Sequence, residues 1–67
     1  MRISYNKLWK MLIDKNMKKS DLKEKAGISS ASIAKLGKGD NITTDVLLRI
    51  CEAMECHLDD IMETVDE

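Results

Sequence analysis

The sequence is short of the residues that interrupt or cross-link a chain: its 67 residues include no proline, no phenylalanine, three glycines, two cysteines and one histidine. No run of apolar residues exceeds three, so no segment is long enough to span a membrane, and the N-terminus lacks the apolar stretch of a signal peptide. We therefore expect a cytoplasmic protein in which Cys51 and Cys56 are reduced thiols outside any disulfide framework.

The same scarcity argues against catalysis and against a metal site. His57, the sole histidine, has no evident nucleophile beside it, and no glycine-rich phosphate loop is present. A structural zinc site needs four ligands, whereas the chain offers two cysteines and one histidine. A metal site or a redox pair at Cys51, Cys56 and His57 is therefore the weaker interpretation. We expect no enzymatic activity, no metal and no cofactor.

Strand signals are also scarce, because β-branched residues are scattered and apolar residues do not alternate with period two. Apolar residues instead recur at helical spacing along nearly the whole chain. The sequence predicts an all-α fold in one thin-cored domain over residues 1–67, with five helices at about 5–16, 19–26, 30–37, 44–55 and 58–63. Leu58 and Ile61 are expected to close the core. Residues 2–4 fit either a frayed arm or a short edge strand, and residues 64–67 are expected to be frayed.

Residues 17–38 predict two short helices joined by a tight turn. Gly27 ends the first helix, where a left-handed residue is needed, and Ser29 is a good N-cap for the next. Ile33 and Leu36 then face the core together. This unit is a helix-turn-helix, which places its second helix in the major groove of DNA. The outward side of that helix carries Ser30, Ala31, Ser32, Ala34 and Lys35.

The net charge of −1 conceals a strong asymmetry. Residues 1–38 hold ten Lys or Arg and three Asp or Glu, whereas residues 39–67 hold one Arg and nine Asp or Glu. A ligand meets the local field, since charges beyond about 8–10 Å are screened at physiological salt. A basic half that contains the helix-turn-helix suits a DNA-binding protein, and a solvated mixture of charges is the plain alternative.

A set of residues in fixed order runs from Leu22 to Ile61 and carries a resemblance that covers residues 4–63. Its members are Leu22, Ala26, Gly27, Ile28, Ser29, Ile33, Leu36, Lys38, Gly39, Ile42, Thr44, Leu47, Ile50, Leu58, Asp60 and Ile61. With the five predicted helices, this set resembles the Cro and phage-repressor type of DNA-binding domain, also called the Xre family. No single short motif in the set is specific for this family, whereas the whole set in its order is. The runs LWKMLIDKNMKKSDL and KLGKGDNITTDVLLRICEAMEC further resemble small stand-alone bacterial regulators.

The chain departs from the family's pattern in its first three helices. Lys19 replaces a phosphate-binding Gln at the start of the second helix, a contact that a cation can also make. Lys23 replaces a small residue where the two helices nearly touch, so its stem must reach out past the third helix. Leu12 and Gly37 replace an Arg–Glu pair, which fits an apolar contact in place of an ion pair. Because Gly37 costs about 1 kcal/mol of helix propensity, the third helix is expected to end early.

The resemblance implies a recognition helix that reads bases near its N-terminus. The base-facing residues are then Ser30, Ala31, Ser32 and Lys35. Since this helix carries no Arg, Asn or Gln, we expect modest base specificity, helped by DNA shape. Phosphate contacts are expected from residues at or beside helix ends, where free N–H groups add to the attraction: Lys19, Ser29, Lys38, Thr43 and Thr44.

A single copy of so small a domain would bind DNA too weakly, and the usual remedy is a two-fold dimer on an inverted repeat. Our dimer candidates, for which peripheral core is the plain alternative, are Trp9, Ile13, Leu48, Met62 and Val65. The sequence thus predicts a sequence-specific transcriptional regulator, a repressor that binds double-stranded DNA as a homodimer. The other interpretation is a protein-interaction module, an antirepressor or antitoxin-like partner, that keeps the fold without binding DNA.

Overall fold

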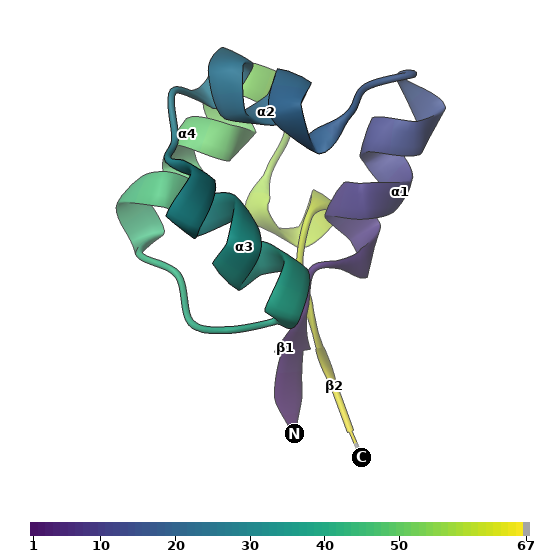
Figure 1. The fold of residues 1–67 in the computed structure, drawn as a ribbon. Coiled ribbons are helices and arrows are strands. Elements are labelled where there is room, and N and C mark those ends of the chain that lie inside the picture. Colours follow the sequence, from purple (N-terminus) through teal and green to yellow (C-terminus); the bar gives the residue numbers. More distant parts are fainter. Residues whose placement is uncertain (67) are drawn as a thin grey trace.

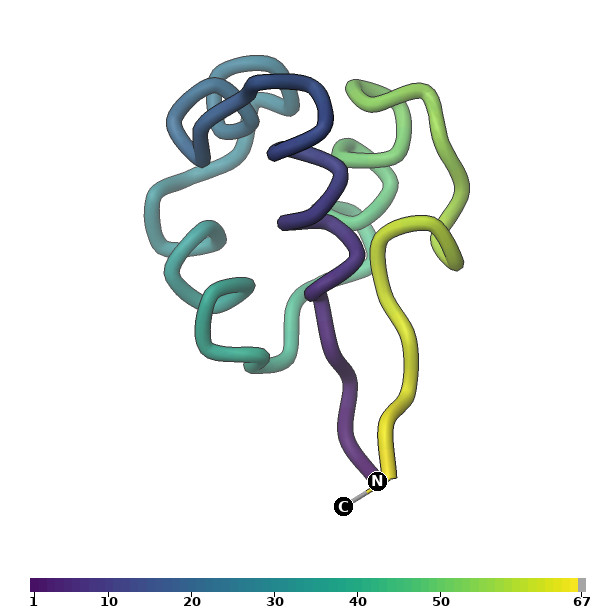
Figure 2. Tube along the Cα trace, turned by 90° about the vertical axis from the view of Figure 1, so that its right-hand side faces the viewer, coloured from purple at the N-terminus to yellow at the C-terminus, as the bar shows by residue number. Residues whose placement is uncertain are grey.

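The structure, a computed structural model, describes residues 1–66. Among these residues it has four α-helices and two short strands: β1 (Arg2–Ser4), α1 (Asn6–Asp14), α2 (Lys19–Ala26), α3 (Ser30–Lys38), α4 (Thr44–Met54) and β2 (Glu63–Val65). The helices form a rounded body, and the two strands extend from it side by side toward the chain ends (Figure 1). Figure 2 shows this ribbon of strands from a second direction. The fold is therefore mostly helical.

The two strands pair antiparallel, with Ile3 opposite Thr64 at the centre of the ladder. The short edge strand, one of the two interpretations of residues 2–4, is confirmed, whereas the all-α prediction and the expectation of fraying from residue 64 are wrong for the C-terminal strand. Glu67 lies outside the described residues. Strands of three residues are too short to show period-two alternation. Their partners also lie at opposite ends of the sequence, so no local pattern reveals the pairing.

The fifth helix predicted at 58–63 is wrong. In its place a single 3₁₀ turn, η1 (Leu58–Asp60), leads into β2. The turn begins with a capping bond, in which the Asp60 carboxylate accepts from the His57 N–H at 2.9 Å. It ends because the chain must become extended to pair with β1. Leu58 is 43% exposed, contrary to prediction, whereas Ile61 is fully buried and closes the core as predicted.

The other helix boundaries follow the capping residues. α1 is shorter at both ends than the predicted 5–16, because Tyr5 is its N-cap and Lys15 is its C-cap. The Ser4 side chain lies one residue further back and accepts a hydrogen bond from the Asn6 N–H at 3.3 Å. α2 has its predicted range. α4 begins at the predicted residue 44, where the Thr43 side chain caps it, and ends one residue early.

Gly37 does not end α3 early, contrary to prediction. The helix continues through Lys38 and stops at Gly39, whose φ of +73° is the left-handed conformation of a helix C-cap. The propensity cost of one glycine, about 1 kcal/mol, is smaller than the stabilisation of about 1.5–3 kcal/mol from burying a leucine. Leu36, the preceding residue, is only 1% exposed, and its burial holds the helix together at this point.

The hydrophobic core contains residues from all four helices. Its innermost side chains are Leu8, Leu22, Leu36, Ile50 and Ile61. Because α2 and α3 each contribute one of these leucines, and α2 also packs against α4, the helix-turn-helix is held firmly to the rest of the body. Within residues 1–66, no helix has both the length and the apolar character that crossing a membrane requires.

Candidate nucleic-acid interface

The turn between α2 and α3 has the geometry that the sequence predicts. Gly27 has φ +66° and ψ +40°, the left-handed conformation that glycine adopts without strain. Its N–H and that of Ile28 both donate to the Lys23 carbonyl, which satisfies the last turn of α2. Ile28 is buried, so the chain is anchored to the core between the two helices. These contacts set the direction in which α3 leaves α2.

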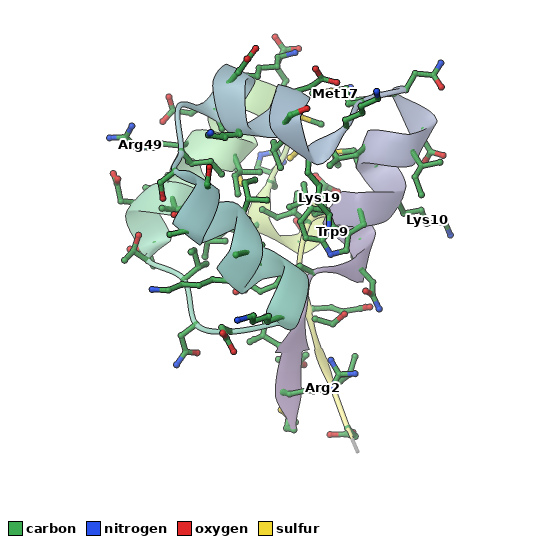
Figure 3. All side chains as sticks on the ribbon, viewed as in Figure 1. Arg2, Trp9, Lys10, Met17, Lys19 and Arg49 are labelled. Atoms are coloured by element: carbon green, nitrogen blue, oxygen red, sulfur yellow. The ribbon has the colours of Figure 1, made fainter. Side chains whose placement is uncertain are left out.

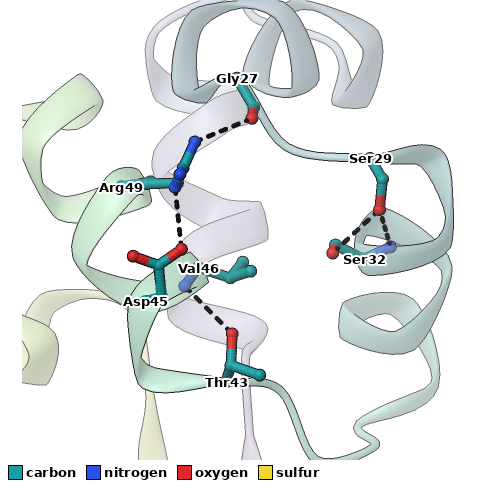
Figure 4. Close-up of polar contacts among 7 residues, drawn as sticks. All are labelled: Gly27, Ser29, Ser32, Thr43, Asp45, Val46 and Arg49. Atoms are coloured by element: carbon teal, nitrogen blue, oxygen red, sulfur yellow. Dashed lines mark hydrogen bonds and ion pairs between the residues drawn. The ribbon is translucent and has the colours of Figure 1, made fainter.

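A pair of serines fixes the start of α3. The exposed Ser29 accepts a hydrogen bond at Oγ from the Ser32 N–H, and its hydroxyl donates to the Ser32 Oγ, both at 3.1 Å (Figure 4). The predicted N-cap at Ser29 is confirmed. These bonds use the Ser29 proton inside the protein, while the Ser32 hydroxyl keeps its own proton for an outside acceptor.

Most of the predicted base-facing side chains of α3 project into solvent. Ser30, Ala31 and Lys35 are exposed, and Ser32 is half-buried. Leu36 is buried, so the helix is anchored by one side and open on the other. The open side is polar and carries small side chains near the helix start, with one cation a turn further on. Small side chains permit a helix to approach a groove closely.

Apart from Ser29, the N-cap of α3, the predicted phosphate contacts lie at three helix ends. Lys19 is the first residue of α2, Lys38 the last of α3 and Thr44 the first of α4, and all three are exposed. The Thr43 hydroxyl caps α4 by accepting a hydrogen bond from the Val46 N–H at 3.3 Å (Figure 4). First-turn N–H groups without helical partners therefore lie next to Lys19 and Thr44, where they add donors for an anion.

Arg49 on α4 contacts the turn, which the sequence analysis did not foresee. Its Nη1 donates to the Gly27 carbonyl at 3.4 Å, and its Nε forms an ion pair with Asp45 at 3.0 Å (Figure 4). The i,i+4 spacing of Asp45 and Arg49 was the available signal, because it predicts an ion pair along one face of α4. The contact with Gly27 depends on how α4 packs and has no local signal.

Lys19 lies against Trp9 of α1. Its Nζ is 4.6 Å from the centroid of the indole ring (Figure 3). Trp9 is half-buried and packs against the core, as expected of a peripheral core residue, which was the alternative to a dimer contact. The sequence predicts a phosphate contact for Lys19 and a dimer contact for Trp9, and it carries no local signal for the contact between them.

The remaining dimer candidates differ in exposure. Ile13 is 73% exposed on α1 and Leu48 is 54% exposed on α4. Met62 is half-buried and packs against the core, and Val65 is half-buried on β2. Ile13 and Leu48 are therefore the candidates whose apolar surface the described part of the chain leaves in solvent.

The thiols of Cys51 and Cys56 are free, the first buried and the second half-buried. Burial raises the pKa of the Cys56 thiol, and the neighbouring Cys51 raises it further. A raised pKa keeps a thiol protonated and therefore weakly nucleophilic at neutral pH. Burial also raises the pKa of Tyr5. Over residues 1–66, no three His, Cys, Asp or Glu side chains are grouped as the ligands of a metal ion would be.

Comparison with known proteins identifies relatives of this site. The sequence matches the family model of the Cro/C1-type helix-turn-helix DNA-binding domain over residues 7–67. It is 42% identical over 55 residues to an uncharacterised helix-turn-helix transcriptional regulator of Bacillus subtilis (strain 168), YozG; that match covers 79% of this chain and 66% of the relative, just under two thirds of its length. The crystal structure of the transcriptional regulator VanUg is also similar, with a TM-score of 0.92 and 53% identity, and the match covers 98% of this chain and 88% of that one.

Proposed function

The chain belongs to the family of Cro/C1-type helix-turn-helix DNA-binding domains, and we propose that it represses transcription by binding double-stranded DNA as a homodimer at an inverted repeat. Residues 1–67 act as one DNA-binding domain in this proposal, in the cytoplasm with the DNA. The observation that carries the proposal is the open side of α3, where Ser30, Ala31 and Lys35 are exposed while Leu36 anchors the helix.

In the proposed complex, α3 enters the major groove with its N-terminal turn leading. Lys35 donates to guanine O6 or N7, and the Ala31 methyl touches a thymine methyl. The hydroxyls of Ser30 and Ser32 either donate or accept, so they discriminate weakly between bases. Because the helix has no Arg, Asn or Gln for a bidentate contact, DNA shape contributes much of the specificity.

Phosphate contacts supply most of the proposed affinity. They come from side chains at or beside helix ends, Lys19, Lys38, Thr43 and Thr44, whereas the Ser29 hydroxyl donates to Ser32 and has no proton left for a phosphate. If about four phosphates are neutralised per subunit, the log of the affinity falls against the log of the salt concentration with a slope of about −3 to −4 per subunit. A steep salt dependence is therefore a direct consequence of this site.

A homodimer joins two such sites, so that two recognition helices read two half-sites related by the same two-fold axis. Ile13 and Leu48 are the exposed apolar residues that the proposed dimer would cover. Occupancy of a promoter by a protein of this kind is enough to block transcription. Repression therefore needs no surface beyond the DNA-binding and dimer contacts.

The proposal is tested by gel shift at low salt on the DNA that flanks the gene for this chain. The variant K35E/K38E should abolish the shift and retain full helicity, whereas K10E/K15E, with the same change of net charge on α1 and its C-cap, should retain the shift. A folded, dimeric wild type that binds no DNA at low salt would overturn the function. Unchanged binding by K35E/K38E would mean that another face meets the DNA. Selection of bound sites from random DNA then gives the half-site spacing.

A protein-interaction module is the second candidate function. It is favoured by the acidic composition of residues 39–67, with nine Asp or Glu and one Arg, and by the weak base readers on α3. Such a module would leave DNA unbound in the gel shift and retain its dimeric, folded state. The same experiment therefore separates the two candidates.

A further inference from the structure

The contact between Lys19 and Trp9 joins an exposed side chain to one that packs against the core. Lys19 is exposed at the start of α2, and its ammonium lies 4.6 Å from the Trp9 ring centroid, within cation–π range (Figure 3). Trp9 is packed against the core from α1. The neighbouring Leu8 and Leu12 are buried, which holds that face of α1 in place. The ring is thus a platform whose position does not depend on the lysine.

Gly37 on α3 leaves room for the same ammonium. A Cβ atom at position 37 would lie 3.7 Å from the Lys19 Nζ, which is ordinary contact for a methyl group. A longer side chain would compete with the ammonium for its space. The Lys19 ammonium therefore lies where three helices meet. It contacts the Trp9 ring of α1, its own side chain comes from α2, and Gly37 of α3 lies beside it.

The surroundings of this position attract anions. A small open cavity of about 110 Å³ is lined by both Trp9 and Gly37, and also by Lys38. None of the described residues that line it is Asp or Glu. Within residues 1–66, no carboxylate forms an ion pair with Lys19. The nearby acidic residue of α2, Asp21, instead accepts a hydrogen bond from the Lys18 N–H at 2.8 Å.

We propose that Trp9 is a positioning residue: its ring holds the Lys19 ammonium at the junction of α1, α2 and α3, ready to contact a phosphodiester of the DNA backbone. A free lysine stem loses rotamer freedom when it binds a phosphate, and a stem already held by an aromatic ring loses less. Trp9 thereby raises DNA affinity without touching DNA. This inference rests on the proposed DNA-binding function.

A double-mutant cycle on DNA binding tests the coupling of the two residues. W9L keeps apolar bulk and removes the aromatic ring, and K19Q keeps much of the stem and removes the charge. W9L should weaken binding about two- to fivefold in the wild-type background, the range expected of a cation–π contact. In the K19Q background W9L should have almost no effect, because the ring then has no ammonium to position. W9F and K19R, which keep an aromatic ring and a cation, should retain most of the affinity.

Fluorescence gives a second readout, because Trp9 is the only tryptophan in the chain. The ammonium imposes an electric field on the indole ring, so K19Q should shift the emission of the free protein. DNA should change the emission of the wild type, because a phosphate bound to the ring-held ammonium offsets the field that the ammonium imposes on the indole, and this change should be absent in K19Q. A structural role for Trp9 alone predicts the K19Q shift in the free protein but no change on DNA binding that depends on Lys19.

If W9L does not fold, the Gly37 side of the junction provides an independent cycle. G37E should pair a carboxylate with the ammonium and weaken DNA binding, whereas the neutral G37Q should weaken it much less. The difference between G37E and G37Q should be smaller in the K19Q background, where only the direct repulsion between the carboxylate and the phosphates remains. If W9L, or G37E, weakens DNA binding equally in the wild-type and K19Q backgrounds, the inference is overturned. It is also overturned if the Trp9 emission changes neither on the K19Q substitution nor on DNA binding. A wild type that binds no DNA at low salt would instead overturn the proposed function.

Discussion

Arg49 on α4 donates a hydrogen bond from Nη1 to the carbonyl oxygen of Gly27, the glycine that closes α2, across 3.4 Å. The donor carries a positive charge and meets the C-terminal end of a helix, where the helix dipole favours a cation. The ion pair with Asp45 holds the guanidinium in that orientation. The turn of the helix-turn-helix is therefore braced by a side chain from α4 that takes no part in the turn itself.

Replacing Arg49 should destabilise the fold, because it removes the contact between α4 and the turn. R49A is expected to lower the free energy of unfolding by about 1 kcal/mol, because it removes the bond to Gly27 and the ion pair together. D45N removes the charge of the exposed i,i+4 ion pair but keeps an amide oxygen that can accept from Arg49, so it should cost about 0.3–0.5 kcal/mol. Urea denaturation followed by circular dichroism measures both. Equal losses in the two variants would mean that the contact with Gly27 contributes nothing to stability.

Two glycines should respond to alanine with opposite signs. Gly27 has φ +66°, so G27A forces a left-handed alanine and should destabilise the fold by about 1–2 kcal/mol. Gly37 is an α-helical residue of α3 with room for a methyl group, so G37A should stabilise by about 1 kcal/mol, equivalent to a rise in Tm of about 4–8 °C. Thermal unfolding of the pair checks the assignment of the turn. A stabilising G27A would contradict it.

The helix-turn-helix was predictable because its signals are local. Gly27 and Ser29 act on residues within one helical turn of themselves, and α2 has the predicted boundaries. The pairing of Ile3 with Thr64 and the contact of Arg49 with Gly27 join distant positions. Such contacts are set by how the helices pack, which no periodicity in a single sequence encodes. The base and phosphate contacts remain predictions, since their geometry depends on DNA.

Stability should fall at alkaline pH through Cys56. The folded pKa of this thiol is raised, first by burial and then by Cys51, so the unfolded chain loses the proton at a lower pH than the folded one. The contribution is fully present below the ordinary cysteine pKa of about 8.5 and is lost as pH rises through the folded pKa. C56A should flatten this decline, leaving the later one due to Tyr5, whose pKa is raised from 10.0. Urea midpoints measured from pH 7 upward give both profiles. An identical alkaline decline in C56A would show that the thiol is not responsible.

The proposed dimer contact can be tested without unfolding the protein. Ile13 and Leu48 are 73% and 54% exposed, so I13E/L48E should change the free energy of unfolding of the monomer by no more than about 0.5 kcal/mol per site. The same change should convert a dimer into a monomer in light scattering after size exclusion. L58E is the matched control, because Leu58 is also exposed, at 43%, and has no place in the proposed contact. A dimer that survives I13E/L48E would place the interface elsewhere.

The salt dependence of binding should separate the base contact of Lys35 from the phosphate contact of Lys38. K38Q removes one phosphate contact, so affinity should fall by a similar factor for all sequences and the salt slope should become shallower by about 0.9 per subunit. K35Q removes a donor to guanine and should cost about 1–3 kcal/mol at the preferred site, with a smaller loss on unrelated DNA. K10Q serves as the control, since Lys10 lies on the side of α1 that faces away from α3 (Figure 3). Fluorescence anisotropy with labelled duplexes at several salt concentrations measures all three variants. If K35Q lowers affinity equally for every DNA sequence, Lys35 contacts the DNA backbone. The base specificity of α3 then comes from its serines and from DNA shape.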